Sequence, residues 1–143
     1  MQMYHTENFG EWHMKTIDLN IKEKKFPGVY LLYGEEVYLK RQYRDKLLAA
    51  LTLPGDTMNF SAYQGKDINP GELIDLAETL PFFAEKRVIL VEDSGFFKTT
   101  CDALAEYFPQ VNETTCFIFV ESEVDKRGRT YKAVKKSGSA VEF

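Results

Sequence analysis

The chain has 143 residues, of which 44% are hydrophobic and 28% charged, and its formal net charge is −4. This length predicts a single domain with an apolar core that needs neither disulfides nor metal. The acidic balance excludes a domain that binds nucleic acid over its whole surface, so any such contact would require a local basic patch. No apolar run approaches the roughly 18 residues that span a bilayer, and we expect no membrane partner. Cys101 and Cys116 lie far apart without a nearby His, which favours reduced thiols in a cytoplasmic protein over a disulfide or metal site.

Apolar strands and amphipathic helices alternate along the chain after residues 1–13, which have the character of an N-terminal extension of unknown role. In chain order the patterns predict a helix over 14–25, a strand over 29–33, a helix over 37–51, a strand over 58–63, a helix over 70–80, a strand over 87–91, a helix ending at 108, a strand over 116–120, a helix over 126–136 and a strand over 140–143. Five strands without a hairpin signal are typical of right-handed crossovers. We therefore expect an α/β domain with a five-stranded parallel sheet flanked by helices.

Several of these helices carry recognisable end signals. Asn69-Pro70-Gly71-Glu72 combines an Asn cap, a proline in the first turn and a glutamate for a capping box. Pro81 should end that helix at the preceding residue. Ser94 or Thr100 is the expected cap of the helix that ends at 108, and Asp125 is the expected cap of the basic helix over 126–136.

The segment from Gly34 to Arg41 lies between the first strand and the helix over 37–51, where a phosphate-binding loop would be. A working loop needs G-x-x-x-x-G-K followed by Ser or Thr, so that backbone amides surround the phosphates and a hydroxyl binds magnesium. Here a leucine replaces the second glycine and Arg41 replaces the hydroxyl residue, while Glu35 and Glu36 place negative charge where phosphates would lie. We predict a degenerate loop that binds no nucleotide. The alternative is an active P-loop ATPase that uses Lys40 on phosphate.

The strand over 87–91 leads into Glu92 and Asp93, an arrangement that resembles a Walker B strand whose acids hold magnesium. A buried strand with an acidic exit is the favoured interpretation, because no competent phosphate loop accompanies it. We therefore predict no catalytic residue, no metal and no cofactor.

One basic cluster stands out near the end of the chain. Its members are Lys126, Arg127, Arg129, Lys132, Lys135 and Lys136. Such a cluster could contact DNA phosphates. It is more often the solvated face of a helix, with Tyr131 and Val134 turned inward in this case. A DNA-binding domain remains the second alternative.

The corner Leu80-Pro81-Phe82-Phe83 places two adjacent aromatic rings where a connecting loop is normally polar. Both rings could pack under the sheet edge, where each would stabilise the fold by roughly 1.5–3 kcal/mol. They could equally form an exposed apolar plug that enters a pocket of a partner. Physical arguments from the sequence leave these two interpretations evenly balanced.

The sequence resembles the delta subunit of bacterial DNA polymerase III from about Met14 to its end. The resemblance is carried by Val29 to Glu36 with Tyr38-Leu39, by the helix followed by Leu-Pro-Phe-Phe and a strand, by Val124-Asp125-Lys126-Arg127 with Tyr131-Lys132-Ala133, and by the closing Val141-Glu142-Phe143. It implies an AAA+-like three-layer domain of the P-loop NTPase type that has lost ATP binding. The domain would then be a non-catalytic, non-ATPase component of the DNA polymerase III holoenzyme.

The same resemblance implies that Leu80, Pro81, Phe82 and Phe83 bind a hydrophobic pocket of the sliding clamp, the beta subunit, and help to open the ring for loading onto primed DNA. Glu78 stands near the position where clamp-binding motifs often carry Gln. Family members continue into lid and collar domains that assemble with delta prime and the loader ATPase subunits. Residues 14–143 would then be the N-terminal domain alone, and DNA would be met indirectly in the assembled loader at a cytoplasmic, nucleoid-associated replisome.

Overall fold

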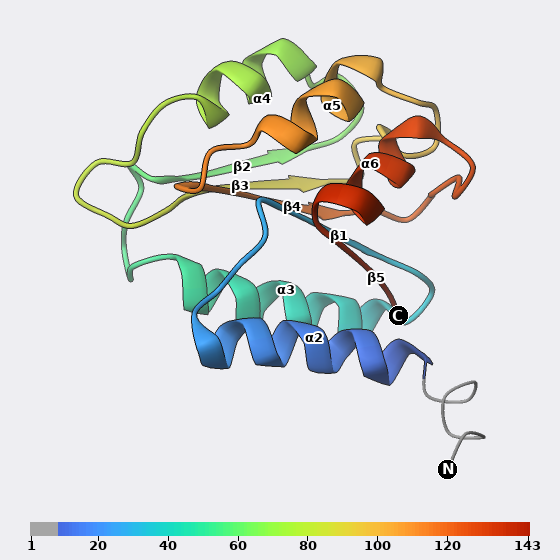
Figure 1. The fold of residues 1–143 in the computed structure, drawn as a ribbon, viewed down its shortest axis with the longest axis horizontal. Coiled ribbons are helices and arrows are strands. Elements are labelled where there is room, and N and C mark those ends of the chain that lie inside the picture. The colour runs from blue at the N-terminus through green and yellow to red at the C-terminus, as the bar shows by residue number, and fades with distance from the viewer. Residues whose placement is uncertain (1–8) are drawn as a thin grey trace.

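The computed structural model describes residues 9–143, with side chains from residue 15 onward. In chain order its elements are α2 (Phe9–Glu23), β1 (Val29–Tyr33), α3 (Val37–Leu51), β2 (Phe60–Gln64), α4 (Pro70–Ala77), β3 (Arg87–Glu92), α5 (Asp102–Tyr107), the 3-10 helix η1 (Phe108–Gln110), β4 (Thr115–Val120), α6 (Arg129–Ser137) and β5 (Ser139–Glu142). The five strands form one parallel sheet in the order β2-β3-β4-β1-β5. Helices α4, α5 and α6 cover one face of this sheet, and α2 and α3 cover the other (Figure 1). The predicted five-stranded parallel α/β fold is confirmed.

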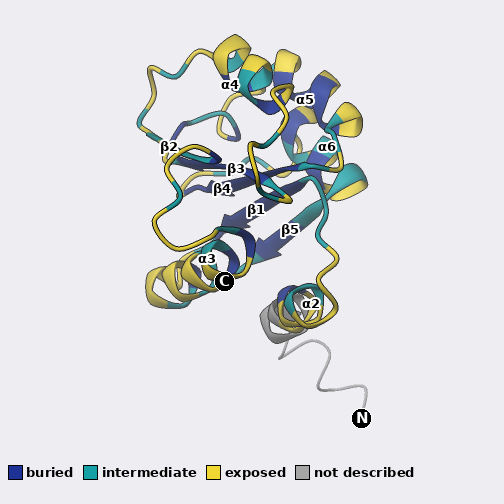
Figure 2. Ribbon diagram, turned by 90° about the vertical axis from the view of Figure 1, so that its left-hand side faces the viewer, coloured by how far each residue is buried: buried dark blue, intermediate teal, exposed yellow. Residues whose placement is uncertain are grey.

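The central strands are buried on both faces, as continuous apolar runs in a parallel sheet should be (Figure 2). Side chains alternate between two cores because successive residues of a strand point to opposite faces. On β1, Leu31 contributes to the core under α4, α5 and α6, whereas Tyr30 and Leu32 contribute to the core that receives Leu47 and Leu51 of α3. The spacing of the leucines in the sequence thus determines which face of α3 meets the sheet.

Several predicted boundaries are wrong, and local hydrogen bonds explain most of them. Helix α4 ends at Ala77 rather than Leu80. The Thr79 amide donates to the Leu76 carbonyl, three residues back, and the Thr79 hydroxyl donates to the Asp75 carbonyl that a helical Thr79 amide would have used. The N-cap of α4 is as predicted, since the Asn69 side chain accepts a hydrogen bond from the Gly71 amide.

The basic helix also begins later than predicted. Helix α6 starts at Arg129 with Gly128 as N-cap, because the Asp125 carboxylate accepts the amide of Arg127 and closes a separate turn. Lys126 and Arg127 therefore lie in that turn and not on the helix.

Neither predicted cap of the helix ending at 108 serves that role. The N-cap of α5 is Cys101, without a side-chain hydrogen bond. The Ser94 hydroxyl donates to the Glu121 carboxylate, and the Thr100 hydroxyl accepts from the Arg129 amide.

The N-terminal helix is longer than predicted, since α2 begins at Phe9 and ends at Glu23. It therefore includes residues 9–13 of the predicted extension, whose residues 1–8 lie outside the described part of the chain. Among the described residues, no helix is long and apolar enough to cross a bilayer, and no three His, Cys, Asp or Glu residues are grouped closely enough to hold a metal.

Candidate protein-docking site

The segment Leu80–Phe83, which we call the plug, lies in the loop between α4 and β3 at the amino edge of the sheet. It projects from the left-hand end of the molecule in Figure 1. The side chains of Leu80, Phe82 and Phe83 are 67%, 53% and 88% exposed, and Pro81 is half-buried. The aromatic rings therefore do not pack under the sheet edge, so the first of the two interpretations is wrong. The rings are exposed as the second requires, and their entry into a pocket of a partner stays a prediction.

Backbone geometry explains how two neighbouring rings point the same way. Phe83 has a φ of 54°, in the left-handed region that aromatic residues rarely adopt. This conformation turns its ring toward Phe82, so that the ring centroids lie 4.4 Å apart in an edge-to-face arrangement. In a regular strand or helix the two side chains would diverge. The plug is thus a paired aromatic surface and not two separate rings.

Two buried polar side chains bind the backbone of the plug from below. The Asn59 amide accepts a hydrogen bond from the Phe82 N–H at 2.5 Å and donates one to the Phe82 carbonyl at 2.8 Å. The Arg87 guanidinium donates to the carbonyl groups of Thr79 and Leu80, and also to that of Met58 in the turn before β2. Asn59 and Arg87 are only 4% and 6% exposed.

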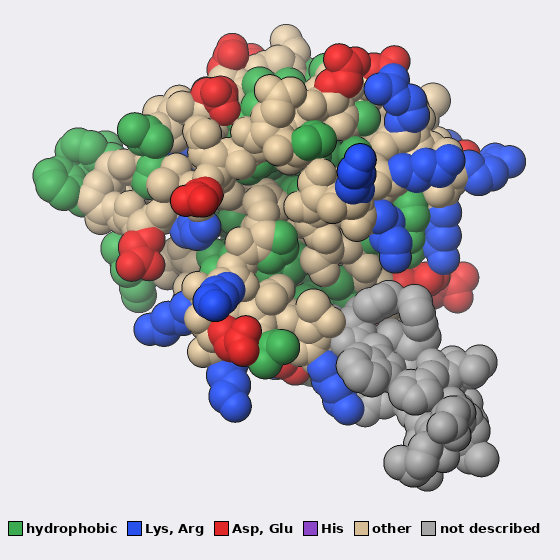
Figure 3. All heavy atoms as spheres, in the orientation of Figure 1, with side chains coloured by type: hydrophobic (Ala, Val, Ile, Leu, Met, Phe, Trp, Pro, Cys, Tyr) green, Lys and Arg blue, Asp and Glu red, His purple; other side chains and the backbone are tan. Residues whose placement is uncertain are grey.

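The plug is part of a wider apolar surface at the amino edge of the sheet. Green side chains gather at the left-hand end of the space-filling view (Figure 3), where strongly exposed hydrophobic residues include Leu53, Met58, Leu80, Phe82 and Phe83. A cleft of about 740 Å³ lies beside the plug, with apolar walls from Ile21, Phe26, Leu51, Leu53, Phe83 and Ala84 and with Lys24, Glu85 and Lys86 also lining it. Exposed apolar surface of this kind marks interaction sites in soluble domains.

The segment from Gly34 to Arg41, predicted to be a degenerate phosphate loop, lies at the opposite, carboxyl edge of the sheet. The Lys40 ammonium is buried and donates to the carbonyl groups of Gly34, at 3.0 Å, and Glu121, at 3.3 Å. Burial lowers the pKa of Lys40, and the carboxylates of Asp93 and Glu121 partly offset this effect. The residue that would bind phosphate in a working loop is therefore already bonded to the protein's own backbone.

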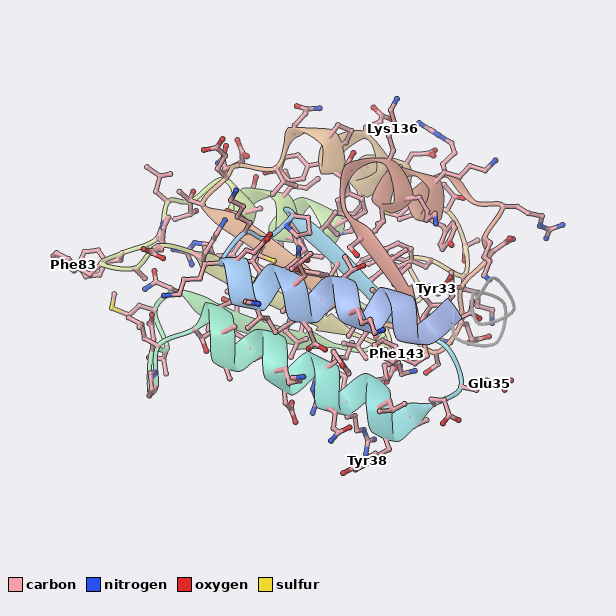
Figure 4. All side chains as sticks on the ribbon, turned by 60° about the horizontal axis from the view of Figure 1, so that its bottom comes forward. Tyr33, Glu35, Tyr38, Phe83, Lys136 and Phe143 are labelled. Atoms are coloured by element: carbon pink, nitrogen blue, oxygen red, sulfur yellow. The ribbon has the colours of Figure 1, made fainter. Side chains whose placement is uncertain are left out.

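The C-terminal strand also occupies this edge. The Glu36 amide donates to the Phe143 carbonyl at 3.3 Å, and a Cβ atom at Gly34 would lie 2.2 Å from that same oxygen. Gly34 thus permits a close backbone approach at a φ of 108°. Glu35, Glu36 and Arg41 are exposed, and Glu35 points outward in Figure 4. The structure brings Gly34 and Lys40 together but leaves the other three residues in solvent.

The acidic exit of β3 has partners of its own. Glu92 forms a 2.9 Å ion pair with Arg44, and Asp93 accepts a hydrogen bond from the Ser122 hydroxyl. Close by, the buried Glu121 carboxylate accepts hydrogen bonds from the Ser94 hydroxyl and from the amides of Ser94 and Gly95. Burial raises the pKa of Glu121 to about 7, although these hydrogen bonds favour its charged form.

The basic cluster is partly neutralised by carboxylates. Lys126 pairs with Glu142, Arg127 with Asp125 and Arg129 with Asp102, at distances of 2.6–3.1 Å. Lys132, Lys135 and Lys136 are exposed on α6. The prediction that Val134 faces inward is confirmed, while Tyr131 is half-buried with its hydroxyl 3.1 Å from that of Tyr33.

Comparison with known proteins identifies the family. Residues 30–143 match the sequence profile of the family described as DNA polymerase III, delta subunit. The chain belongs to this family. A curated relative, DNA polymerase III subunit delta of Bacillus subtilis (strain 168), is 24% identical over 135 residues, which cover 86% of this chain and 39% of that protein. The chain thus spans about two fifths of the length of this relative.

Two solved structures share the fold. The Bacillus subtilis DNA clamp loader delta protein superposes with a TM-score of 0.81 at 23% identity, over 91% of this chain and 42% of that one. A gamma subunit-related protein from Thermotoga maritima superposes with a TM-score of 0.62 at 13% identity, over 92% and 45% of the two chains. The resemblance drawn from the sequence is therefore confirmed at the level of family and fold.

Sequence reasoning missed three residues that organise this delta-family domain, namely Asn59, Arg87 and Glu121. A weak signal existed for two of them. Arg87 is a charged residue at the start of an apolar strand, and Asn59 interrupts the apolar pattern at the start of the strand predicted over 58–63. Glu78, the nearest candidate for the Gln that clamp-binding motifs often carry, is engaged within the domain because its carboxylate accepts a hydrogen bond from the Tyr107 hydroxyl.

Proposed function

We propose that this domain is the clamp-binding part of a clamp-loader delta subunit in DNA replication. The plug enters an apolar pocket on the sliding clamp, with Phe82 and Phe83 as anchors and Leu80 and Pro81 as support. The observation that carries this proposal is the exposed, edge-to-face pair of rings at the amino edge of the sheet. Aromatic anchors that fill a pocket supply most of the binding energy of an interface, whereas two such rings in water stabilise the free domain very little.

Ring opening follows from differential binding. If the plug binds the clamp more tightly when one ring interface is open or distorted, its binding energy shifts the clamp toward the open state. A ligand can shift such an equilibrium only by its difference in affinity for the two states, so no bond is made or broken in the domain itself. ATP bound by other loader subunits would control when the plug is presented, with delta prime and the ATPase subunits as further partners.

The contacts of Lys40 and Glu92 argue against an ATPase role for this domain. Both residues that would serve phosphate and magnesium already have protein partners. DNA contact in the assembled loader is compatible with the three exposed lysines of α6, Lys132, Lys135 and Lys136, but the acidic net charge makes the domain a weak DNA-binding module by itself.

The experiment is a binding measurement with the cognate sliding clamp on an optical biosensor. Phe82→Ala with Phe83→Ala should weaken clamp binding by about 30-fold or more, the usual effect of truncating two anchors at the centre of an interface. The matched control is Val37→Ala with Tyr38→Ala, which removes two exposed apolar side chains at the start of α3, at the opposite, carboxyl edge of the sheet, where Figure 4 shows Tyr38.

Both double variants should remain folded, because the side chains removed are at least half exposed. Normal clamp binding by the Phe82→Ala, Phe83→Ala variant would refute the proposal, and so would an equal loss of binding in the control. Ring opening is tested separately by the release of clamps from closed circular DNA. The Phe82→Ala, Phe83→Ala variant should lose this release activity together with clamp binding.

A further inference from the structure

We propose that Asn59 and Arg87 are positioning residues that fix the plug in the conformation received by the clamp, an inference that rests on the proposed function. Neither side chain reaches the surface, so neither would touch the clamp. Together they bind the main chain of residues 79–82 and connect it to the turn over 56–59, which is remote in sequence. The plug is thereby preorganised as part of a rigid edge.

Asn59 is matched to this task because its side chain has both an acceptor and a donor. Its Oδ1 accepts the Phe82 amide while its Nδ2 donates to the Phe82 carbonyl, so one side chain satisfies both main-chain groups of a plug residue. The second Nδ2 hydrogen goes to the Asp56 carboxylate at 2.8 Å, and the same carboxylate accepts the amides of Met58 and Asn59. This network fixes the amide orientation of Asn59, and only Asn can form it at this place.

Arg87 complements Asn59 on the other side of the plug. Each of its three nitrogens donates to a main-chain carbonyl group, two in the segment that leads from α4 and one at Met58. A buried cation that bonds only to neutral carbonyl groups bears a desolvation cost, and an apolar residue would avoid that cost. Unlike an apolar residue, the guanidinium offers a planar set of donors. These donors hold the segment at Thr79 and Leu80 at a fixed distance from the turn at Met58.

Such anchoring matters for an exposed apolar loop. Free in water, a short loop would sample many conformations, and Phe83 would leave its left-handed conformation because an aromatic side chain disfavours it. Every residue that must be ordered on binding reduces affinity. Because Phe82 is bound at both its amide and its carbonyl, the two rings stay paired before the clamp binds. The conformational entropy of this loop is therefore lost during folding and not during binding.

The inference is tested with Asn59→Ala and Arg87→Met in the chain of residues 1–143, with the plug residues unchanged. Clamp affinity should fall by about 5- to 30-fold, corresponding to one backbone residue that must now be ordered on binding, at roughly 1–2 kcal/mol. It should not fall below that of a linear peptide of residues 78–86, because all contact side chains remain. Amide hydrogen exchange at Phe82 should become much faster in Asn59→Ala.

Thr130→Val is the matched control for lost stability. Thr130 is also buried, its hydroxyl accepts the Cys101 amide, and it lies on α6 away from the plug. This variant should lose a comparable hydrogen bond but keep wild-type clamp affinity and wild-type exchange at Phe82. Arg87→Lys keeps the charge but has fewer directed donors, so its clamp affinity should lie between those of wild type and Arg87→Met. If Arg87→Met does not fold, Arg87→Lys takes its place in the comparison with wild type.

The outcomes separate the two proposals. If wild-type protein does not bind the clamp, or if the Phe82→Ala, Phe83→Ala variant binds normally, the proposed function fails. If wild type binds through the rings but Asn59→Ala binds equally well, or Thr130→Val weakens binding to the same extent, the positioning role of Asn59 is refuted. Slow exchange at Phe82 in Asn59→Ala would refute it as well.

Discussion

Glu121 should make the stability of this domain fall as pH rises through neutrality. Its carboxyl group is 1% exposed, and burial raises its pKa from the ordinary 4.5 to about 7. Asp93 adds to this rise, while hydrogen bonds from Ser94 and Gly95 oppose it. The folded state therefore holds the Glu121 proton more tightly than the unfolded state does. The stabilising contribution is complete below about pH 4.5 and is lost as pH rises through 7.

The magnitude follows from the difference between the two pKa values. A difference of about 2.5 units, at 1.36 kcal/mol per unit, corresponds to about 3 kcal/mol across the whole window. Glu121→Gln keeps a neutral side chain of the same shape at every pH. The variant should therefore match wild type near pH 5 and exceed its stability near pH 8.

The assay is urea unfolding of both proteins at pH 5 and pH 8, followed by circular dichroism. Titrating groups remote from Glu121 contribute equally to both proteins, so the difference between wild type and Glu121→Gln reports this carboxyl group together with its coupling to Lys40 and Asp93. A difference that is constant between the two pH values would refute the reasoning. A variant that loses stability relative to wild type at pH 8 would show that the ionised carboxylate, with its four hydrogen-bond contacts to Ser94 and Gly95, is the stabilising form.

Two further predictions concern the two edges of the sheet. Phe83→Gly should change the free energy of unfolding by less than about 1 kcal/mol, because relief of the left-handed φ offsets the greater freedom of glycine in the unfolded chain. Thermal unfolding measures this change, and a fall in melting temperature of more than about 8 °C would mean that the Phe83 ring supports the fold. Millimolar Mg-ATP should neither raise the melting temperature nor be hydrolysed, whereas a site filled at 100 times its dissociation constant would stabilise the protein by about 2.7 kcal/mol.

The parts of the fold that sequence predicted well are those in which local pattern and tertiary packing agree. Both ends of α3 lie where the leucine spacing and the preceding Gly34 placed them, at Val37 and Leu51. The strand after Pro27-Gly28 is likewise found at 29–33. In the strand a continuous apolar run defines the buried residues, and in α3 apolar residues at three- and four-residue spacing define the buried face. Both patterns are local, and the packing agrees with them.

The contacts that hold the candidate site could not be predicted in this way, because they join residues far apart in the chain. Asn59 binds Phe82 across 23 positions and Lys40 binds the Glu121 carbonyl across 81. Sequence pattern contains no signal for which polar residue will meet which carbonyl group. The exposure of the Phe82 and Phe83 rings could not be decided from sequence for a related reason. It depends on whether the fold leaves a buried cavity that could receive the rings, and not on the hydrophobicity of the rings themselves.

The two edges of the sheet are organised by separate sets of contacts in this domain. In parallel α/β domains ligands bind at the carboxyl ends of the strands, and here Lys40 and the backbone of Phe143 occupy the place beside β1 where a phosphate-binding loop would lie. The plug lies on the loop that precedes β3, at the amino edge, and Figure 4 shows Phe83 and Glu35 at opposite ends of the molecule. The contacts at the two edges share no residue, so substitutions at the carboxyl edge should leave the plug unchanged. Stability and docking should accordingly be separable, with Glu121 substitutions altering the first and Asn59 substitutions lowering clamp affinity beyond any change in stability.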